Sequence, residues 1–196
     1  MNPKFLPKKI TSTLTWRQLL INEKEFRLIK KLETRLNKQV LESNKSHLAL
    51  FHGPPGTGKT LTASLLGKYT GRDVYRVDLF LVISKYIGET EKNLATIFQK
   101  LLSKDAILFF DEADAIFGKR TAVRDAHDKF ANQEVSYLLQ KIENHPGLVI
   151  FSVATLKNID DSFTRRFETI VAFKHLSVMQ RSMFKFKNYF RTFIRS

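Results

Sequence analysis

The chain has 196 residues, 43% of them hydrophobic, a size that suits one well-packed domain with flanking pieces. It contains no cysteine and no apolar stretch near the roughly 18 residues of a membrane span, so we expect a cytoplasmic protein without disulfides or a membrane span. The net charge of +14 lies on the flanks, because residues 51–173 hold 16 Lys or Arg against 15 Asp or Glu, and this near-neutral centre argues against a nucleic-acid partner.

The predicted elements begin with residues 1–21, where Pro3 and Pro7 favour an extended N-terminal lead-in. Asn22 and Glu25 are typical of a helix start, and apolar residues then recur at helical spacing. Downstream, short apolar runs predict five strands, at 48–52, 73–78, 106–111, 148–154 and 169–173. Helical patterns fill the gaps at residues 59–70, 90–103 and 128–144. This alternation predicts an α/β domain over residues 22–173, with a five-stranded parallel sheet between two layers of helices.

A last helix is predicted from about Ser177, where Ser177 and Gln180 form a plausible capping box. Its apolar stripe consists of Met179, Met183, Phe186, Phe190 and Phe193, and basic residues occupy the remaining positions. Such a helix could lie on a membrane, but the commoner meaning is packing against another protein surface.

A glycine-rich segment follows the first predicted strand and precedes a predicted helix, and it reads G-x-x-x-x-G-K-T. Alone, such a turn could be an ordinary loop. In this position its backbone N–H groups and the positive end of the helix are suited to phosphate oxygens. Lys59 would reach the β- and γ-phosphates, and the hydroxyl of Thr60 would bind Mg²⁺. The residues expected to bind the nucleotide are Gly53, Pro54, Pro55, Gly56, Thr57, Gly58, Lys59, Thr60, Leu61 and Asp111.

The second half of the predicted site is the apolar run 107–110 followed by Asp111 and Glu112. An acidic pair after an apolar strand is usually only a solvated strand end, but open α/β sheets bind ligands at this end of their strands. Asp111 would hold Mg²⁺ with Thr60, and Glu112 would polarise the attacking water. Together with Lys59, Glu112 is therefore expected to be catalytic. Because the sequence has no Asn-Lys-x-Asp segment for guanine, the expected cofactors are ATP and Mg²⁺.

With both phosphate-site motifs placed, residues 84–94 resemble the central-pore loop and following helix of AAA+ ATPases of the classical clade. The resemblance implies a P-loop ATPase that forms a ring, in this family a hexamer, on ATP binding. It also implies that a protein substrate is gripped by a pore loop made of Lys85, Tyr86, Ile87 and Gly88. Taken alone, this segment would be a surface turn with an exposed tyrosine.

The pair Arg165 and Arg166 is similar to the position where these ATPases carry arginine fingers. Such fingers reach the γ-phosphate bound by the neighbouring subunit and stabilise the charge of the transition state. One of the two could instead bridge to a local carboxylate, and the sequence leaves open which one is the finger.

A closer resemblance covers residues 10–173, to AAA+ ATPases encoded with bacterial contractile injection systems. Its longest matching runs are Thr57–Gly67, Ser84–Leu94, Ile107–Arg120 and Asp125–Glu143. Two departures stand out. This chain has Leu156 where the family normally has a polar residue that orients the lytic water, so Thr155 or Asn158 would have to substitute. By the same resemblance, we expect residues 174–196 to form only the start of the helical lid.

The leading functional hypothesis is Mg²⁺-dependent ATP hydrolysis used to remodel a protein or to assemble or take apart a complex, such as a contractile injection system. The alternative is a nucleotide-binding regulatory module with little or no hydrolysis, which the two departures favour. A DNA-handling AAA+ protein is the third hypothesis, and the neutral centre of the chain counts against it.

Overall fold

The computed structural model describes residues 7–38, 46–78, 106–114, 147–157 and 161–177, with single residues 140, 142, 145, 159, 179 and 182. The predicted helices at 90–103 and 128–144 therefore fall almost wholly outside the described residues. The same holds for the last helix beyond Ser177. No helix in the described ranges combines the length and the hydropathy needed to cross a bilayer.

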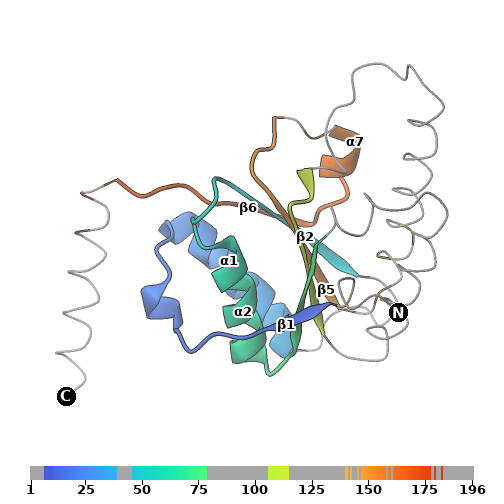
Figure 1. The fold of residues 1–196 in the computed structure, drawn as a ribbon, viewed down its shortest axis with the longest axis horizontal. Coiled ribbons are helices and arrows are strands. Elements are labelled where there is room, and N and C mark those ends of the chain that lie inside the picture. The colour runs from blue at the N-terminus through green and yellow to red at the C-terminus, as the bar shows by residue number, and fades with distance from the viewer. Residues whose placement is uncertain are drawn as a thin grey trace.

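The described part of the chain is built on one six-stranded sheet with the order β1-β3-β4-β5-β2-β6 (Figure 1). Its strands are β1 (Lys8–Ile10), β2 (His47–His52), β3 (Val74–Asp78), β4 (Ile107–Asp111), β5 (Leu148–Val153) and β6 (Thr169–Ala172). Strands β2 to β6 are parallel, which confirms the five predicted strands. The sixth strand corrects the prediction of a five-stranded, wholly parallel sheet, because β1 pairs antiparallel with β3.

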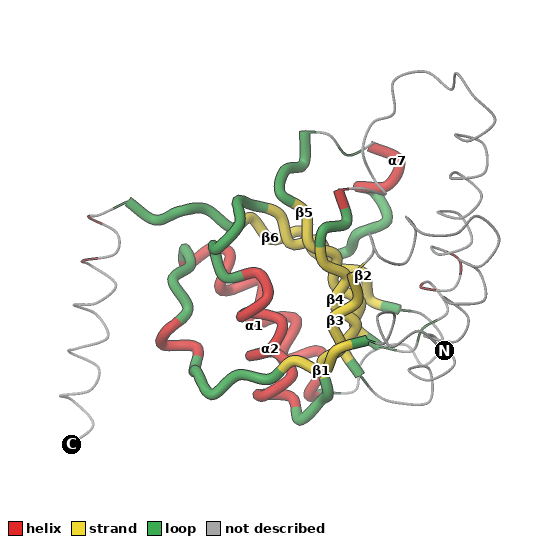
Figure 2. The backbone as a smooth tube through the Cα atoms, viewed as in Figure 1, coloured by secondary structure: helices red, strands yellow, loops and turns green. Residues whose placement is uncertain are grey.

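Of the described α-helices, two pack on one face of the sheet and a short one lies on the opposite side (Figure 2). Helix α1 (Glu23–Asn37) starts at Asn22 as predicted, and α2 (Lys59–Thr70) starts directly after the glycine-rich segment. The short helix α7 (Asp161–Thr164) follows β5. Gly71, in the left-handed conformation at φ 69°, ends α2.

Both faces of the sheet are buried, as a parallel sheet requires. On the α1 and α2 side, alternate strand residues such as Phe51, Phe109 and Ile150 pack against Ile29 and Leu65. On the other side, Leu50, Phe110 and Phe151 pack with residues that include Ile159 and Phe167. The central strands therefore read as continuous apolar runs, because neither of their faces meets water.

The lead-in is anchored to α1 and α2 through Trp16, which lies in the 3-10 turn Trp16–Gln18. The indole stacks on Tyr69 with ring centroids 5.5 Å apart and meets the edge of Phe26 at 5.9 Å. The ammonium group of Lys68 donates to the carbonyl oxygens of Thr13 and Leu14, at 3.1 and 2.8 Å. These contacts hold the nearby residue Leu19 in the core beside the loop that leads into α2.

Candidate functional site

The loop between β2 and α2 has a backbone that glycine alone tolerates at three positions. Gly53, Gly56 and Gly58 have φ values of 147°, 74° and 99°, which favour glycine over any residue with a Cβ atom. A Cβ added to Gly53 would lie 1.9 Å from the carbonyl oxygen of Phe173, so this residue also allows a close backbone approach. The loop thus runs from the end of β2, past the backbone of Phe173, to the first turn of α2.

Lys59, the first residue of α2, turns its ammonium group back onto this loop. It donates to the carbonyl oxygens of Gly53 and of Pro54, the latter at 3.0 Å. The hydroxyl of Thr57 donates to the same Pro54 oxygen at 2.7 Å. Burial lowers the pKa of Lys59, and the nearby carboxylates of Asp111 and Asp114 oppose that shift.

The acidic edge of the site lies at the end of β4. Asp111 is 15% exposed and forms an ion pair of 2.8 Å with Arg76 of the neighbouring strand β3. Glu112 is exposed and has a left-handed backbone with φ 55°, which is uncommon for a residue other than glycine. Asp114 accepts the N–H of Ala154 at 2.8 Å and so ties the end of β4 to the end of β5.

The loop and the acidic edge together line one cavity of about 450 Å³. Its walls bring the predicted residues of both motifs together with four that sequence reasoning missed: Asp114, Ser152, Val153 and Ala154. The predicted residues in the lining are Pro55, Gly56, Gly58, Lys59, Thr60, Leu61, Asp111 and Glu112. Gly53, Pro54 and Thr57 shape the loop through their own contacts and do not line the cavity. The acidic pattern Asp-Glu-Ala-Asp at 111–114 was the available signal for Asp114.

The chemistry of this lining suits a triphosphate with Mg²⁺. The N-terminus of α2 opens onto the cavity beside Lys59, and both features attract phosphate. The Thr60 hydroxyl and the Asp111 carboxylate are oxygen ligands of the kind Mg²⁺ prefers. Within the described ranges no three His, Cys, Asp or Glu side chains gather into a metal site. This fits Mg²⁺, which in phosphate-binding sites takes one or two protein ligands together with phosphate oxygens.

Leu156, which stands where the resembled family has a polar residue, does not line the cavity. Leu156 is partly buried against the core on the α7 side of the sheet, and its carbonyl accepts the N–H of Ile159 at 3.0 Å. The hydroxyl of Thr155 accepts the N–H of Lys157 at 3.3 Å, and Thr155 is not part of the lining. Asn158, the other predicted substitute, lies outside the described residues.

The arginine pair does not line this cavity. Arg165 and Arg166 are exposed where α7 ends and are not among the lining residues. Exposure is what a group that acts on a neighbouring subunit requires. The predicted pore loop, Lys85 to Gly88, lies outside the described residues.

Solved structures of other proteins share the fold of this chain. The chain matches solved structures titled "Crystal structure of FIGL-1 AAA domain" and the same domain "in complex with ADP", with TM-scores of 0.71 and 0.69. These matches cover 91% of this chain and 60% and 61% of those chains, and their 17% identity shows the fold alone.

Sequence relatives agree with the structural matches. The chain is 34% identical over 144 residues to "Uncharacterized AAA family ATPase y4kL" of Sinorhizobium fredii, covering 71% of this chain and 43% of that protein. It is also 34% identical over 141 residues to "Cell division protein C" of Sulfolobus acidocaldarius, covering 67% and 38%. The chain thus spans about two fifths of the length of these relatives. Residues 49–175 match the family described as "ATPase family associated with various cellular activities (AAA)", and the chain belongs to this family.

Proposed function

We propose that the chain binds ATP with Mg²⁺ in the cavity between the β2–α2 loop and the end of β4, and hydrolyses it there. The observation that carries this proposal is that one cavity unites Lys59 and Thr60 with Asp111 and Glu112. Phosphoryl transfer needs positioning and charge stabilisation more than covalent help from the protein. A cation, a helix N-terminus and two carboxylates around one cavity are suited to that task.

Each side chain has a proposed role that follows from its place. The ammonium group of Lys59 would exchange its loop carbonyls for phosphate oxygens. Thr60 and Asp111 would hold Mg²⁺, which supplies charge neutralisation when bound. Glu112, exposed at the mouth of the cavity, would orient and deprotonate the attacking water.

Two substitutions test these roles. Lys59→Ala is expected to abolish nucleotide binding, because it removes the cation that faces the phosphates. Glu112→Gln is expected to keep binding and to lower turnover by about 100-fold or more, the usual contribution of a positioned base. A fluorescent ATP analogue reports binding, and phosphate release reports turnover. Lys24→Ala, at an exposed position of α1, is the matched control and should leave both unchanged. Parental turnover in Glu112→Gln would show that another group is the base.

A second function, nucleotide binding with little or no hydrolysis, is favoured by Leu156, whose side chain packs in the core where a polar residue would face the water. Parallel measurement of ATP binding and phosphate release separates the two functions. Tight binding without release of phosphate would support the regulatory module.

At the level of the whole protein we propose a cytoplasmic ring, in this family a hexamer, in which Arg165 or Arg166 reaches the nucleotide of the neighbouring subunit. The pore loop, Lys85 to Gly88, would act on a protein substrate, and a component of a contractile injection system is the proposed target. The support for that target is the resemblance of residues 10–173, while the family match and the relatives support the AAA family. Binding to duplex DNA that falls steeply with salt would favour the DNA-handling hypothesis instead.

A further inference from the structure

The ion pair between Arg76 and Asp111 joins the nucleotide cavity to a residue that does not line it. Asp111 is the proposed Mg²⁺ ligand, and the nearest Arg76 nitrogen, Nη2, lies 2.8 Å from its Oδ2 atom. Arg76 comes from β3, two residues before that strand ends, and lies outside the cavity lining.

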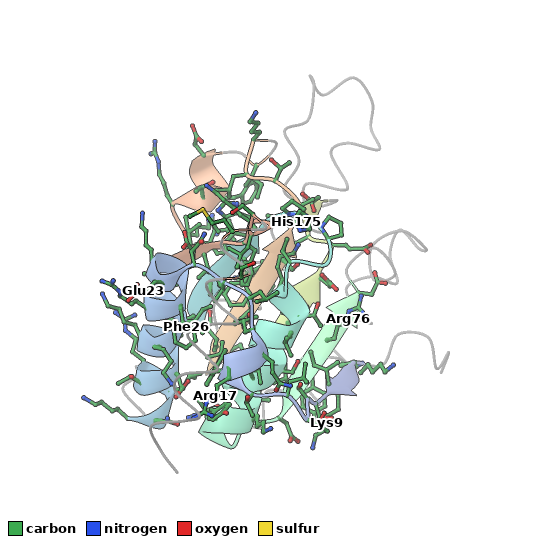
Figure 3. The ribbon with its side chains drawn as sticks, turned by 90° about the vertical axis from the view of Figure 1, so that its left-hand side faces the viewer. Lys9, Arg17, Glu23, Phe26, Arg76 and His175 are labelled. Atoms are coloured by element: carbon green, nitrogen blue, oxygen red, sulfur yellow. The ribbon has the colours of Figure 1, made fainter. Side chains whose placement is uncertain are left out.

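Strand register explains how Arg76 reaches Asp111. In the parallel pair of β3 and β4, Arg76 is opposite Phe109, and Asp78 is opposite Asp111. Side chains alternate along a strand, so Arg76 and Asp111 point to the same face, diagonally across the strand pair. This is the face that α2 covers, because Phe109 packs there with Leu65 and Leu66. Arg76 therefore lies on the sheet on the same side as Lys59 and Thr60. Figure 3 shows it towards the β1 edge, across α2 from Glu23 and Phe26.

The Arg76 side chain is 41% exposed, but part of its guanidinium is enclosed. The guanidinium Nε atom is buried and has no hydrogen-bond partner within the described part of the chain. An arginine on an ordinary surface would keep that N–H in water. In Arg76, Nε is shielded from water while Nη2 forms the ion pair with Asp111.

Asp111 is restrained at both of its carboxylate oxygens. Oδ2 accepts from Arg76, and Oδ1 accepts the backbone N–H of Glu112 at 3.2 Å. A carboxylate offers about four lone-pair sites, so two remain for a metal ion or its bound water. The two contacts fix the direction of the side chain and leave it able to bind.

We propose that Arg76 is the positioning residue of the Mg²⁺ site, holding the Asp111 side chain in one orientation for the metal. This inference rests on the proposed function, because it deepens the role of Asp111 in the same site. Because Arg76 does not line the cavity, it would act on the metal through Asp111. Partners of this kind, one shell behind a metal ligand, change metal affinity by about 10- to 100-fold when removed.

The test measures Mg²⁺ dependence of nucleotide binding in the 196-residue chain. A fluorescent ATP analogue is held at fixed concentration, and Mg²⁺ is titrated from an EDTA-buffered start. Arg76→Met, which keeps the length of the aliphatic stem and removes the charge, is expected to raise the half-saturating Mg²⁺ concentration by about 10-fold or more. Binding in excess EDTA should change little. Arg76→Lys is expected to recover part of the loss, because it restores the charge without the planar fork.

Two further variants test whether Arg76 affects Mg²⁺ binding through Asp111. Lys9→Met removes the neighbouring ion pair of 2.6 Å between Lys9 and Asp73, which is half-exposed, and it should leave the Mg²⁺ titration at the parental value. In an Asp111→Asn background, Arg76→Met should have no further effect, because its only route to the metal is gone. Circular dichroism confirms that each variant is folded.

The outcomes separate cleanly. An unchanged Mg²⁺ requirement in Arg76→Met overturns the inference, and so does a lower one, which would make Arg76 a competitor of the metal. An equal loss in the Asp111→Asn background also overturns it. A parental chain that binds no nucleotide at all would overturn the proposed function, and this inference with it, whereas the other outcomes leave the proposed function intact.

Discussion

Gly53 joins the phosphate-facing loop to the end of the sheet. Its carbonyl accepts from Lys59, and its Cα faces the backbone of Phe173, whose own N–H donates to His52 at 2.7 Å. Gly56 lies three residues on in the same loop, with a left-handed φ of 74° but nothing within 4 Å of the place that a Cβ atom would take. Both glycines have a positive φ, 147° at Gly53 and 74° at Gly56, but only Gly53 has a close neighbour where a Cβ atom would lie.

Replacing each glycine by alanine separates backbone strain from steric overlap. Gly56→Ala is expected to lower the free energy of unfolding by about 1 kcal/mol, the cost of a left-handed alanine. Gly53→Ala is expected to lower it by at least about 3 kcal/mol, since the new methyl group must also displace Phe173. Urea denaturation measures both. Equal losses in the two variants would show that the close approach at Gly53 does not exist in solution.

His52 makes the stability of this region depend on pH. Burial lowers the pKa of His52, the cations Lys174 and Lys59 lower it further, and Glu25 opposes them. The folded protein thus binds fewer protons here than the unfolded chain, whose histidine pKa is about 6.5. The stability of the fold is therefore complete above about pH 6.5 and falls as the pH drops towards the folded pKa.

Removing the imidazole should flatten this dependence. The parental protein is expected to lose more unfolding free energy between about pH 7 and about pH 5 than His52→Gln does. His175→Gln, at an exposed position, is the control and should lose as much as the parent. Urea titrations at the two pH values measure the difference. If His52→Gln and the parent lose the same amount, the burial of His52 has no role in acid sensitivity.

At the scale of elements, the lead-in couples the edge of the sheet to the phosphate loop. Strand β1 covers the edge of β3, Trp16 stacks on α2, and Leu19 lies against Gly58, where an added Cβ would meet it at 2.9 Å. Loss of the Trp16 contacts should therefore loosen a segment that borders the loop.

Trp16→Ala is expected to cost about 2 kcal/mol of stability, to speed trypsin cleavage after Arg17 and to weaken nucleotide binding. Trp16→Phe is expected to behave nearly as the parent, because the indole Nε1 has no hydrogen-bond partner among the described residues to lose. Proteolysis rates and nucleotide titrations report the two effects. Parental trypsin resistance in Trp16→Ala would show that the aromatic contacts do not hold the lead-in.

The parts that the sequence predicts well are those with a local cause. The five parallel strands and α2 begin and end within one or two residues of their predicted bounds, because apolar runs and the glycines mark them, and α1 begins where Asn22 predicts. Strand β1 was missed, since Lys8, Lys9 and Ile10 carry no pattern and become a strand only beside β3. The contact of Arg76 with Asp111 was missed for the same reason. It depends on β3 lying next to β4, and no spacing along the chain shows that.

At the scale of the whole molecule, the exposed arginine pair predicts that catalysis needs two subunits. Arg165→Ala or Arg166→Ala, whichever is the finger, should keep nucleotide binding and lower turnover by about 1,000-fold or more. Mixing the inactive finger variant with Glu112→Gln should restore activity, because some interfaces then join an intact base to an intact finger. Phosphate release from each variant alone and from the mixture measures this. Sizing with and without an ATP analogue follows assembly.

Failure of both arginine variants to reduce turnover would place the second cation elsewhere. A mixture as inactive as its components, in samples that assemble on nucleotide, would argue against sharing of sites between subunits. A persistent monomer with parental turnover would show that each chain works alone.

The hydrogen bonds of Lys59 to its own loop lower the net free energy that the protein gains on binding a nucleotide. The ammonium group already has two carbonyl partners, Gly53 and Pro54. An incoming triphosphate must displace these oxygens, so the net gain is the difference between two sets of bonds. Truncating the lysine would leave both carbonyls without this donor even before nucleotide arrives, and the resting protein itself should then melt at a lower temperature.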